Sequence, residues 1–220
     1  LGGDELPTFQ RETTDDGRPI DIVRFDRSIP NLLERIEAYG DHLVRAAEPH
    51  RPALRLVHVR DPWSAVPLLR AGIVSPGAPA RFVYEVNGLP SIELPYAYPR
   101  IGERTLAKVR ELERECLDAA DAVITPSRVI ASRLATMAPD VEVTVIPNGA
   151  TVPDPLPARP LAAPARYLVY VGAVQPWQGL DVLLAAFARL GDLDDLRLVV
   201  CSATPPKRAR PLVRLAERLG

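Results

Sequence analysis

Short apolar segments alternate with longer amphipathic segments along most of the chain. Most of the apolar segments lack a strict two-residue alternation, which is typical of parallel strands that helices cover on both faces. Seven segments have this strand pattern: residues 20–25, 54–59, 81–86, 122–125, 141–146, 167–171 and 196–201. Because right-handed helical crossovers join parallel strands, the pattern predicts an α/β fold built on doubly wound parallel sheets.

Four longer segments have apolar residues at helical spacing. In residues 103–120, Leu106, Val109 and Cys116 fall on one stripe, and the charged residues between them fall on a solvated face. The other segments are residues 31–47, which Pro30 precedes as a start signal, 180–190 and a final helix near 211–219. These segments are predicted to be helices that cover the sheets.

A proline-rich stretch divides the chain. Five prolines follow Gly149 at short intervals: Pro153, Pro155, Pro157, Pro160 and Pro164. Such a stretch forms a stiff extended connector, because proline cannot donate to a sheet ladder. We therefore predict an N-terminal domain at residues 1–150, a linker at 151–165 and a C-terminal domain at 166–220. The C-terminal domain has only two strand–helix units, too few to bury a parallel sheet, so we expect it to be incomplete.

The charge balance argues against nucleic acid as a partner. The 220 residues include 27 Lys or Arg and 28 Asp or Glu, and they contain no dense basic run. No apolar stretch approaches the roughly 20 residues that span a bilayer, so no integral membrane segment is predicted. Cys116 and Cys201 lack metal-ligand spacing, and we expect both to be reduced core thiols of a cytoplasmic protein. The chain opens at Leu1 without Met or a secretory signal, so a preceding segment is expected.

Several common catalytic motifs are absent from the sequence. It contains neither Gly-x-Gly-x-x-Gly nor Gly-x4-Gly-Lys-Ser/Thr, which disfavours dinucleotide-dependent dehydrogenases and P-loop enzymes. It also lacks Gly-x-Ser-x-Gly and His-Glu-x-x-His, which disfavours the common hydrolases and zinc proteases. With three histidines in the chain, no metal cluster is predicted.

The most informative segment for chemistry is residues 170–187, which combine a strand, a loop bounded by glycines and the start of a helix. Gly172 would let the backbone come close to a ligand. The N–H groups around Gly179 and Leu180 would be free at the helix start and would attract phosphate. The alternative is that both glycines serve only tight turns.

This segment, with Pro176-Trp177-Gln178-Gly179, resembles the donor-binding loop of family-four glycosyltransferases of the GT-B fold. Residues 84–94, 118–127 and 145–149 are similar to further segments of the same family, and the resemblance covers residues 54–220. It implies a GT-B-like α/β fold with two Rossmann-like parallel-sheet domains. The N-terminal domain would face the acceptor and the C-terminal domain would bind the donor.

The resemblance assigns donor binding to Gly172, Ala173, Gln178 and Gly179. Many relatives have Arg where Ala173 stands and Lys where Gln178 stands, and both cations touch the donor diphosphate. Their absence here weakens the expected diphosphate binding, although Gln178 can still donate a neutral hydrogen bond.

Five residues are candidates for the acceptor side. The resemblance implies Asn87 and Gly88, while Arg60 and Asp61 follow an apolar strand at the edge where ligands of open parallel sheets bind. Glu93 is a further candidate, in a predicted loop punctuated by prolines. His58, inside the strand that precedes Arg60, is interpreted as a satisfied structural histidine.

The resemblance implies a retaining, metal-independent transfer from a nucleotide diphosphate sugar, with no cofactor. The catalytic residues are unknown, because the family's Glu-x7-Glu pair would fall beyond Gly220, and we expect the 220-residue chain alone to be inactive. The acceptor is unknown and could be a glycan, a lipid-linked sugar or a small molecule. A lipid-linked acceptor would place the cytoplasmic protein at the inner membrane face. Two alternatives stay open: a non-catalytic nucleotide-sugar or partner binding protein, and a phosphorylase-like enzyme of the same architecture.

Overall fold

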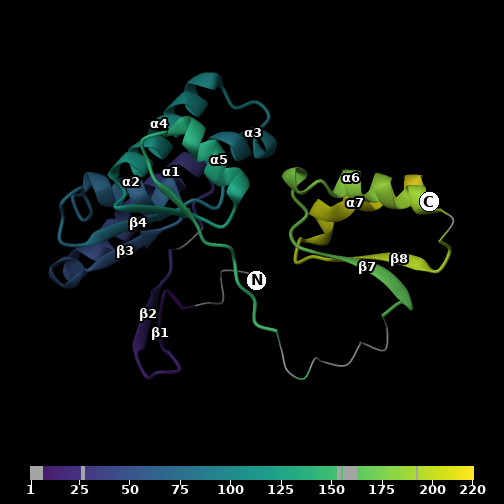
Figure 1. Ribbon diagram of the computed structural model, residues 1–220, viewed down its shortest axis with the longest axis horizontal. Helices are drawn as coiled ribbons and strands as arrows, with labels where there is room; N and C mark the ends of the chain where they lie inside the picture. Colours follow the sequence, from purple (N-terminus) through teal and green to yellow (C-terminus); the bar gives the residue numbers. More distant parts are fainter. Residues whose placement is uncertain (1–6, 26–27, 153–154, 156–162, 192) are drawn as a thin grey trace. The chain divides into compact units, whose positions relative to one another are not determined.

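The computed structural model describes residues 7–25, 28–152, 155, 163–191 and 193–220 (Figure 1). The chain divides into two compact units. The N-terminal unit holds Arg100–Gly149 and the residues up to Pro95, and the C-terminal unit holds Ala150–Gly220 together with Tyr96–Pro99. Most of the predicted linker, residues 151–165, lies outside the described residues.

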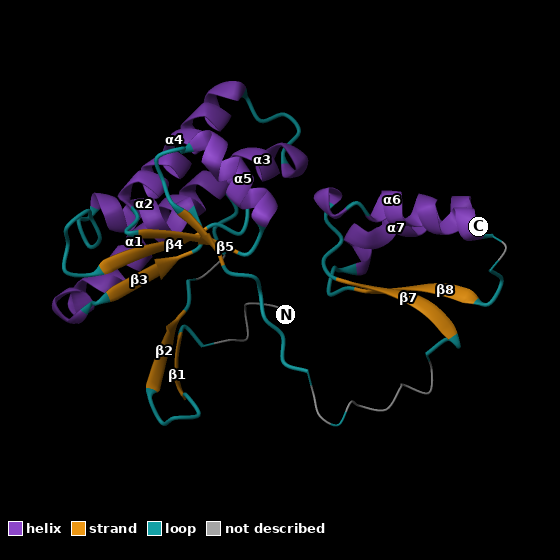
Figure 2. Cartoon of the chain, in the orientation of Figure 1, coloured by secondary structure: helices purple, strands orange, loops and turns teal. Residues whose placement is uncertain are grey.

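The N-terminal unit contains a sheet of four parallel strands (Figure 2). In order they are β3 (Leu56–Val59), β4 (Arg81–Glu85), β5 (Ala122–Thr125) and β6 (Val143–Val145). The helices of the unit are α1 (Leu32–Ala47), α2 (Pro62–Arg70), α3 (Pro90–Ala97), α4 (Glu103–Ala119), α5 (Arg128–Met137) and the 3-10 helix η2 (Glu48–Ala53). The predicted strands and the two predicted helices of this unit agree with these bounds to within two residues at each end.

The order of the four strands follows the order of the chain. Right-handed crossovers then place the connecting helices on one face, and Figure 1 shows α2 and α4 on the same side of the sheet. A doubly wound sheet has a reversal of strand order, and the strands β3 to β6 that the structure describes contain none. Side chains along the strands alternate between buried and partly exposed, as Phe82 and Val83 do, because only one face is fully covered.

The core of the N-terminal unit contains side chains from this sheet and from α2, α4 and α5. Tyr84 and Phe82 are its largest fully buried side chains, and their ring centroids lie 6.4 Å apart. Cys116 is buried in the same core, and burial raises the pKa of its thiol to about 12. The predicted reduced core thiol is therefore confirmed for Cys116. It is wrong for Cys201, whose side chain is exposed at the end of the last strand.

A buried carboxylate holds the start of α3. The Glu113 side chain, from α4, accepts hydrogen bonds of 2.7 Å from the backbone N–H and from the hydroxyl of Ser91. These bonds satisfy a first-turn donor of α3, which has no partner within its own helix. The segment with Glu93 was predicted to be a loop, and this prediction is wrong because a residue far along the chain stabilises the helix start.

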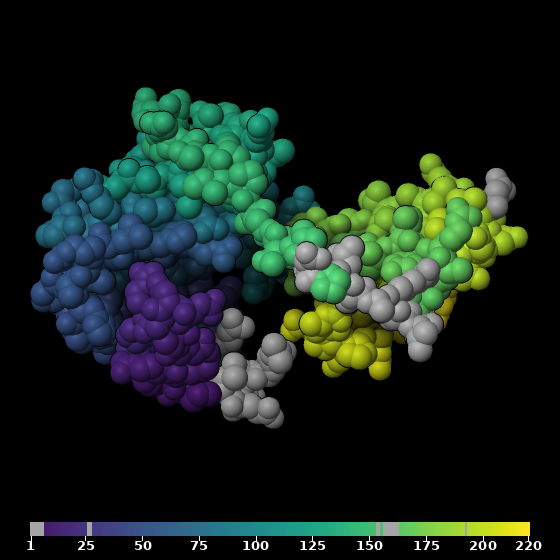
Figure 3. Space-filling view, turned by 60° about the horizontal axis from the view of Figure 1, so that its bottom comes forward, coloured from purple at the N-terminus to yellow at the C-terminus, as the bar shows by residue number. Residues whose placement is uncertain are grey.

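A separate antiparallel hairpin precedes the parallel sheet. It consists of β1 (Phe9–Thr13) and β2 (Pro19–Val23), and its surface is visible in purple in Figure 3. Arg11 and Asp21 form an ion pair across it, with Nε 2.6 Å from Oδ1. The segment 20–25 was predicted to be a parallel strand and is instead part of this hairpin, because β1, a mainly polar segment, is its partner.

The C-terminal unit contains two parallel strands, β7 (Arg166–Val171) and β8 (Leu196–Cys201). Its helices are α6 (Leu180–Phe187), α7 (Pro206–Leu219) and the 3-10 helices η3 (Pro176–Gln178) and η4 (Ala188–Leu190), and α6 packs against α7. Helix α7 begins before the predicted start, with Pro211 inside it. Side chains of β7 stay exposed, such as Val171 at 76%, because few elements cover this strand pair.

The titration of Glu113 should set part of the pH dependence of folding. Burial raises the pKa of Glu113 above its ordinary value despite the two bonds from Ser91. The folded state then holds this proton more tightly than the unfolded chain does. The free energy of unfolding should therefore fall as the pH rises from about 4.3 through the raised pKa, and this fall should be missing in Glu113→Gln.

Urea unfolding at a series of pH values measures this difference. The matched control is Glu111→Gln, an exposed site on the same helix, which should keep the fall seen in the wild type. Parallel pH profiles for the wild type and Glu113→Gln would contradict the prediction.

Candidate functional site

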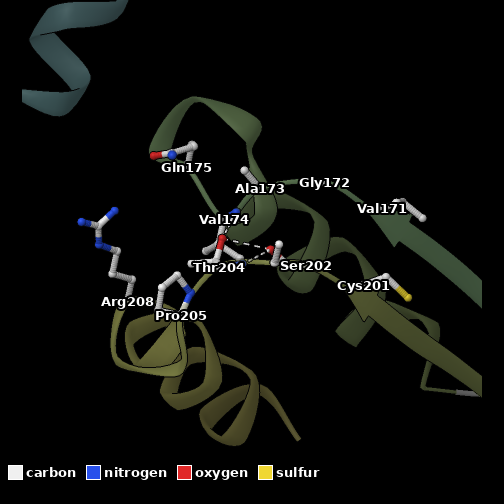
Figure 4. A pocket seen from close by; sticks show the side chains of 11 residues that line it. Val171, Gly172, Ala173, Val174, Gln175, Cys201, Ser202, Thr204, Pro205 and Arg208 are labelled. Atoms are coloured by element: carbon white, nitrogen blue, oxygen red, sulfur yellow. Dashed lines mark hydrogen bonds between the residues drawn. The ribbon is translucent and has the colours of Figure 1, made fainter. Parts of the chain in front are cut away.

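An open cavity of about 650 Å³ lies at the carboxyl ends of β7 and β8 (Figure 4). It lies within the C-terminal unit and is lined by Val171, Gly172, Ala173, Val174, Gln175, Cys201, Ser202, Ala203, Thr204, Pro205 and Arg208. Ligands of open parallel sheets bind at this edge, because the loops that follow the strands diverge there.

Thr204 joins the two loops that line the cavity. Its hydroxyl oxygen accepts a hydrogen bond of 2.9 Å from the backbone N–H of Val174, which follows β7. The same hydroxyl lies 2.9 Å from the hydroxyl of Ser202, and the backbone N–H of Thr204 donates to the Ser202 hydroxyl at 3.1 Å. The loop after β8 therefore fixes the position of the loop after β7.

Gly172 lies at a close approach within the same loop. Its N–H donates to the carbonyl oxygen of Cys201 at 3.0 Å, and the Tyr170 hydroxyl donates to the carbonyl oxygen of Ala173 at 2.8 Å. A Cβ atom at Gly172 would lie 2.9 Å from the Tyr170 hydroxyl oxygen. Only glycine fits here while Tyr170 keeps its hydrogen bond.

The structure separates the four predicted donor-binding residues into two pairs. Gly172 and Ala173 line the cavity, whereas Gln178 and Gly179 lie outside its lining. Gln178 ends the 3-10 helix η3, and Gly179 precedes α6 with a φ of 67°, which favours glycine. The start of α6 has no side-chain cap at Gly179.

Glu85 organises a polar cluster at the carboxyl ends of β3 and β4. One of its carboxylate oxygens lies 2.8 Å from Nε2 of His58, and the other accepts a 2.8 Å hydrogen bond from the Asn87 side chain. Nε of Arg60 lies 3.3 Å from that second oxygen. The hydrogen bond from Asn87 and the nearby charges of Arg60 and His58 hold the pKa of Glu85 below its ordinary value, although partial burial opposes them.

This cluster brings together two of the predicted acceptor-side residues, Arg60 and Asn87. The interpretation of His58 as a satisfied histidine is confirmed by its contact with Glu85. Glu85 itself was not among the site residues predicted from the sequence. Its signal in the sequence was an acidic residue at the end of an apolar strand, shortly before Asn87.

The other acceptor-side candidates have local structural contacts. The Asp61 carboxylate accepts a 2.8 Å hydrogen bond from the backbone N–H of Ser64 and caps α2. Gly88 faces the Glu93 side chain so closely that a Cβ atom at Gly88 would overlap the carboxylate. Gly88 and Glu93 are thus brought together, while Asp61 is engaged in its own helix.

The family model described as Glycosyl transferase 4-like domain matches residues 3–149. The chain belongs to this glycosyltransferase family. The match contains the Glu85 cluster, and the cavity beside Ala173 lies outside it. No curated protein matches the sequence.

Two solved structures show the fold of this glycosyltransferase-family chain. A sucrose-phosphate synthase from Thermosynechococcus elongatus matches with a TM-score of 0.71 and 16% identity over 98% of this chain and 55% of its own. A UDP-forming α,α-trehalose-phosphate synthase from Burkholderia xenovorans, in complex with glucose-6-phosphate, matches with a TM-score of 0.52 and 13% identity over 90% and 50%. The chain thus spans about half the length of these proteins. The predicted GT-B-like α/β fold is confirmed.

In the part of the chain that the structure describes, none of the helices has the length and apolar character needed to cross a bilayer.

Removal of the Thr204 hydroxyl should loosen the cavity. Thr204→Val leaves the N–H of Val174 without its acceptor, a loss of about 1 kcal/mol. Hydrogen exchange at the Val174 amide should then become roughly fivefold faster. Thr136→Val, which removes an exposed hydroxyl in α5, should leave that exchange unchanged. Equal exchange in the wild type and Thr204→Val would show that this bond does not hold the loop.

Proposed function

We propose that the chain forms part of a glycosyltransferase that moves a sugar from a nucleotide diphosphate sugar to an acceptor, with retention and without a metal. The observation that carries this proposal is the cavity at the carboxyl ends of β7 and β8, in a chain that also contains a family-four domain. One structural neighbour is named as UDP-forming, which supports a nucleoside diphosphate as the leaving group.

The donor would bind in the C-terminal unit. Gly172 and Ala173 let the backbone approach the ligand, and the start of α6 beyond Gln178 and Gly179 presents free N–H groups. A helix start with its positive dipole end stabilises phosphate and the negative charge that develops on a departing diphosphate.

The acceptor would bind at the Glu85 cluster. The Arg60 side chain is 65% exposed, so its guanidinium keeps donors free for an acceptor while Nε contacts Glu85. The amide of Asn87 is oriented by the same carboxylate. Gly88 and Glu93 would complete this side, and Asp61 would contribute by fixing the start of α2.

A second candidate is a nucleotide-sugar binding protein without catalysis. It is favoured by Ala173 and Gln178, which supply no positive charge to a diphosphate. The two candidates differ in turnover and agree in nucleotide binding.

Binding and turnover together test the proposal. The 220-residue chain should bind UDP, GDP or ADP in calorimetric titration but consume no nucleotide sugar, because the catalytic carboxylates that the family resemblance implies are not among the site residues assigned in it. A longer protein that contains this chain together with the family's Glu-x7-Glu pair should transfer sugar. Nucleotide binding without transfer in that protein would favour the binding protein, and transfer by the 220-residue chain would contradict the expectation that this chain alone is inactive.

A positive charge at position 178 should strengthen diphosphate binding. Gln178→Lys changes a neutral hydrogen-bond donor at the start of α6 into a cation, and the gain should be about 1 kcal/mol, roughly fivefold in affinity. The gain should shrink at higher salt, because salt screens exposed charges. Calorimetric titration at two salt concentrations measures it, with Gln10→Lys in the hairpin of the other unit as the control. Unchanged affinity at both salts would mean that residue 178 faces away from the phosphates.

A further inference from the structure

Of the eleven described residues that line the cavity, Arg208 is the one with a charged side chain. It lies in the first turn of α7, and Figure 4 shows its guanidinium extending away from that helix. Within the described part of the chain, the guanidinium has no ion pair and no hydrogen bond. An unpaired cation on a cavity wall favours an anionic ligand, because the cation gains an electrostatic partner only when the ligand binds.

The remaining polar groups of the cavity are largely engaged with each other. The N–H groups of Gly172 and Val174 donate to Cys201 and Thr204, so neither is free for a ligand. The N–H of Ala173 has no partner among the described residues. An anion in the cavity could therefore be bound by Arg208 from α7 and by the loop backbone at Ala173.

We infer that Arg208 binds the diphosphate of the donor nucleotide in this cavity and supplies the charge that Ala173 lacks. The inference rests on the proposed function, since it takes the cavity to be the nucleotide site. A guanidinium suits this role, because its planar array of donors can bind two phosphate oxygens at once. The donor would then be held by the Arg208 guanidinium on α7, across the cavity from the loop after β7.

Substitution of Arg208 tests the inference directly. Arg208→Gln should weaken the binding of UDP, GDP or ADP about tenfold, the loss expected for a hydrogen bond to a charged group. Lys207→Gln is the matched control, because it removes the same charge from the adjacent exposed residue outside the cavity lining and should change affinity less than about twofold. Arg208→Lys should retain part of the affinity. Circular dichroism melts should be the same for all variants, since both side chains are exposed.

A compensating substitution locates the anion. In the Arg208→Gln background, Ala173→Arg places a cation on the opposite wall of the same cavity and should restore most of the lost affinity. Equal weakening by Arg208→Gln and Lys207→Gln, or no restoration by Ala173→Arg, would overturn the assignment of Arg208 and leave the proposed function standing. Failure of the wild-type chain to bind any of the three nucleotides would overturn the proposed function itself.

Discussion

Parallel pairing of β3 to β6, and of β7 with β8, is the constraint on which the rest of the structure depends. Parallel neighbours need a helical crossover, so the amino ends of these strands all lie on one side of their sheet and the carboxyl ends all lie on the opposite side. At the amino ends of the strands the contacts are structural: the Asp121 carboxylate accepts a 2.7 Å hydrogen bond from the N–H of Phe82 and a 2.8 Å hydrogen bond from the Arg81 side chain. At the carboxyl ends the loops diverge, and both candidate sites lie there.

The carboxyl ends of the strands carry different charges in the two units. In the N-terminal unit, the negative charge of Glu85 is balanced by donors from His58, Arg60 and Asn87, which gives a preorganised polar surface suited to a neutral or hydroxyl-rich acceptor. In the C-terminal unit, Arg208 has no partner among the described residues, which suits an anionic donor. The proposed division into acceptor and donor sides thus has a physical counterpart in charge.

The shape of the cavity at the carboxyl ends of β7 and β8 depends on hydrogen bonds between segments that are distant in sequence. The Thr204 hydroxyl accepts a hydrogen bond from the N–H of Val174, which lies 30 residues earlier in the sequence. The N–H of Gly172 donates to the carbonyl oxygen of Cys201 over a similar separation. Tyr170 occupies the space that a side chain at position 172 would need. These contacts make the loop after β7 a defined wall rather than an isolated glycine-bounded turn.

The sequence by itself determined the strands β5 and β8, the long helix α4, the glycine-bounded loop and the family, because periodicity and short motifs are local properties of the chain. It did not determine the helix α3, whose start is stabilised by Glu113 from another helix, or the exposure of Cys201, which depends on what covers the strand. It also missed the pairing of β2 with the neighbouring strand β1, because β1 is mainly polar. The same reason applies to the candidate sites. Arg60 was selected as a candidate from its place at a strand end, and Asn87 from the motif that resembles the family. Glu85 as their common partner, and Arg208 as the cation of the cavity, were decided by tertiary packing, which alone brings side chains from separate strand–helix units to one edge.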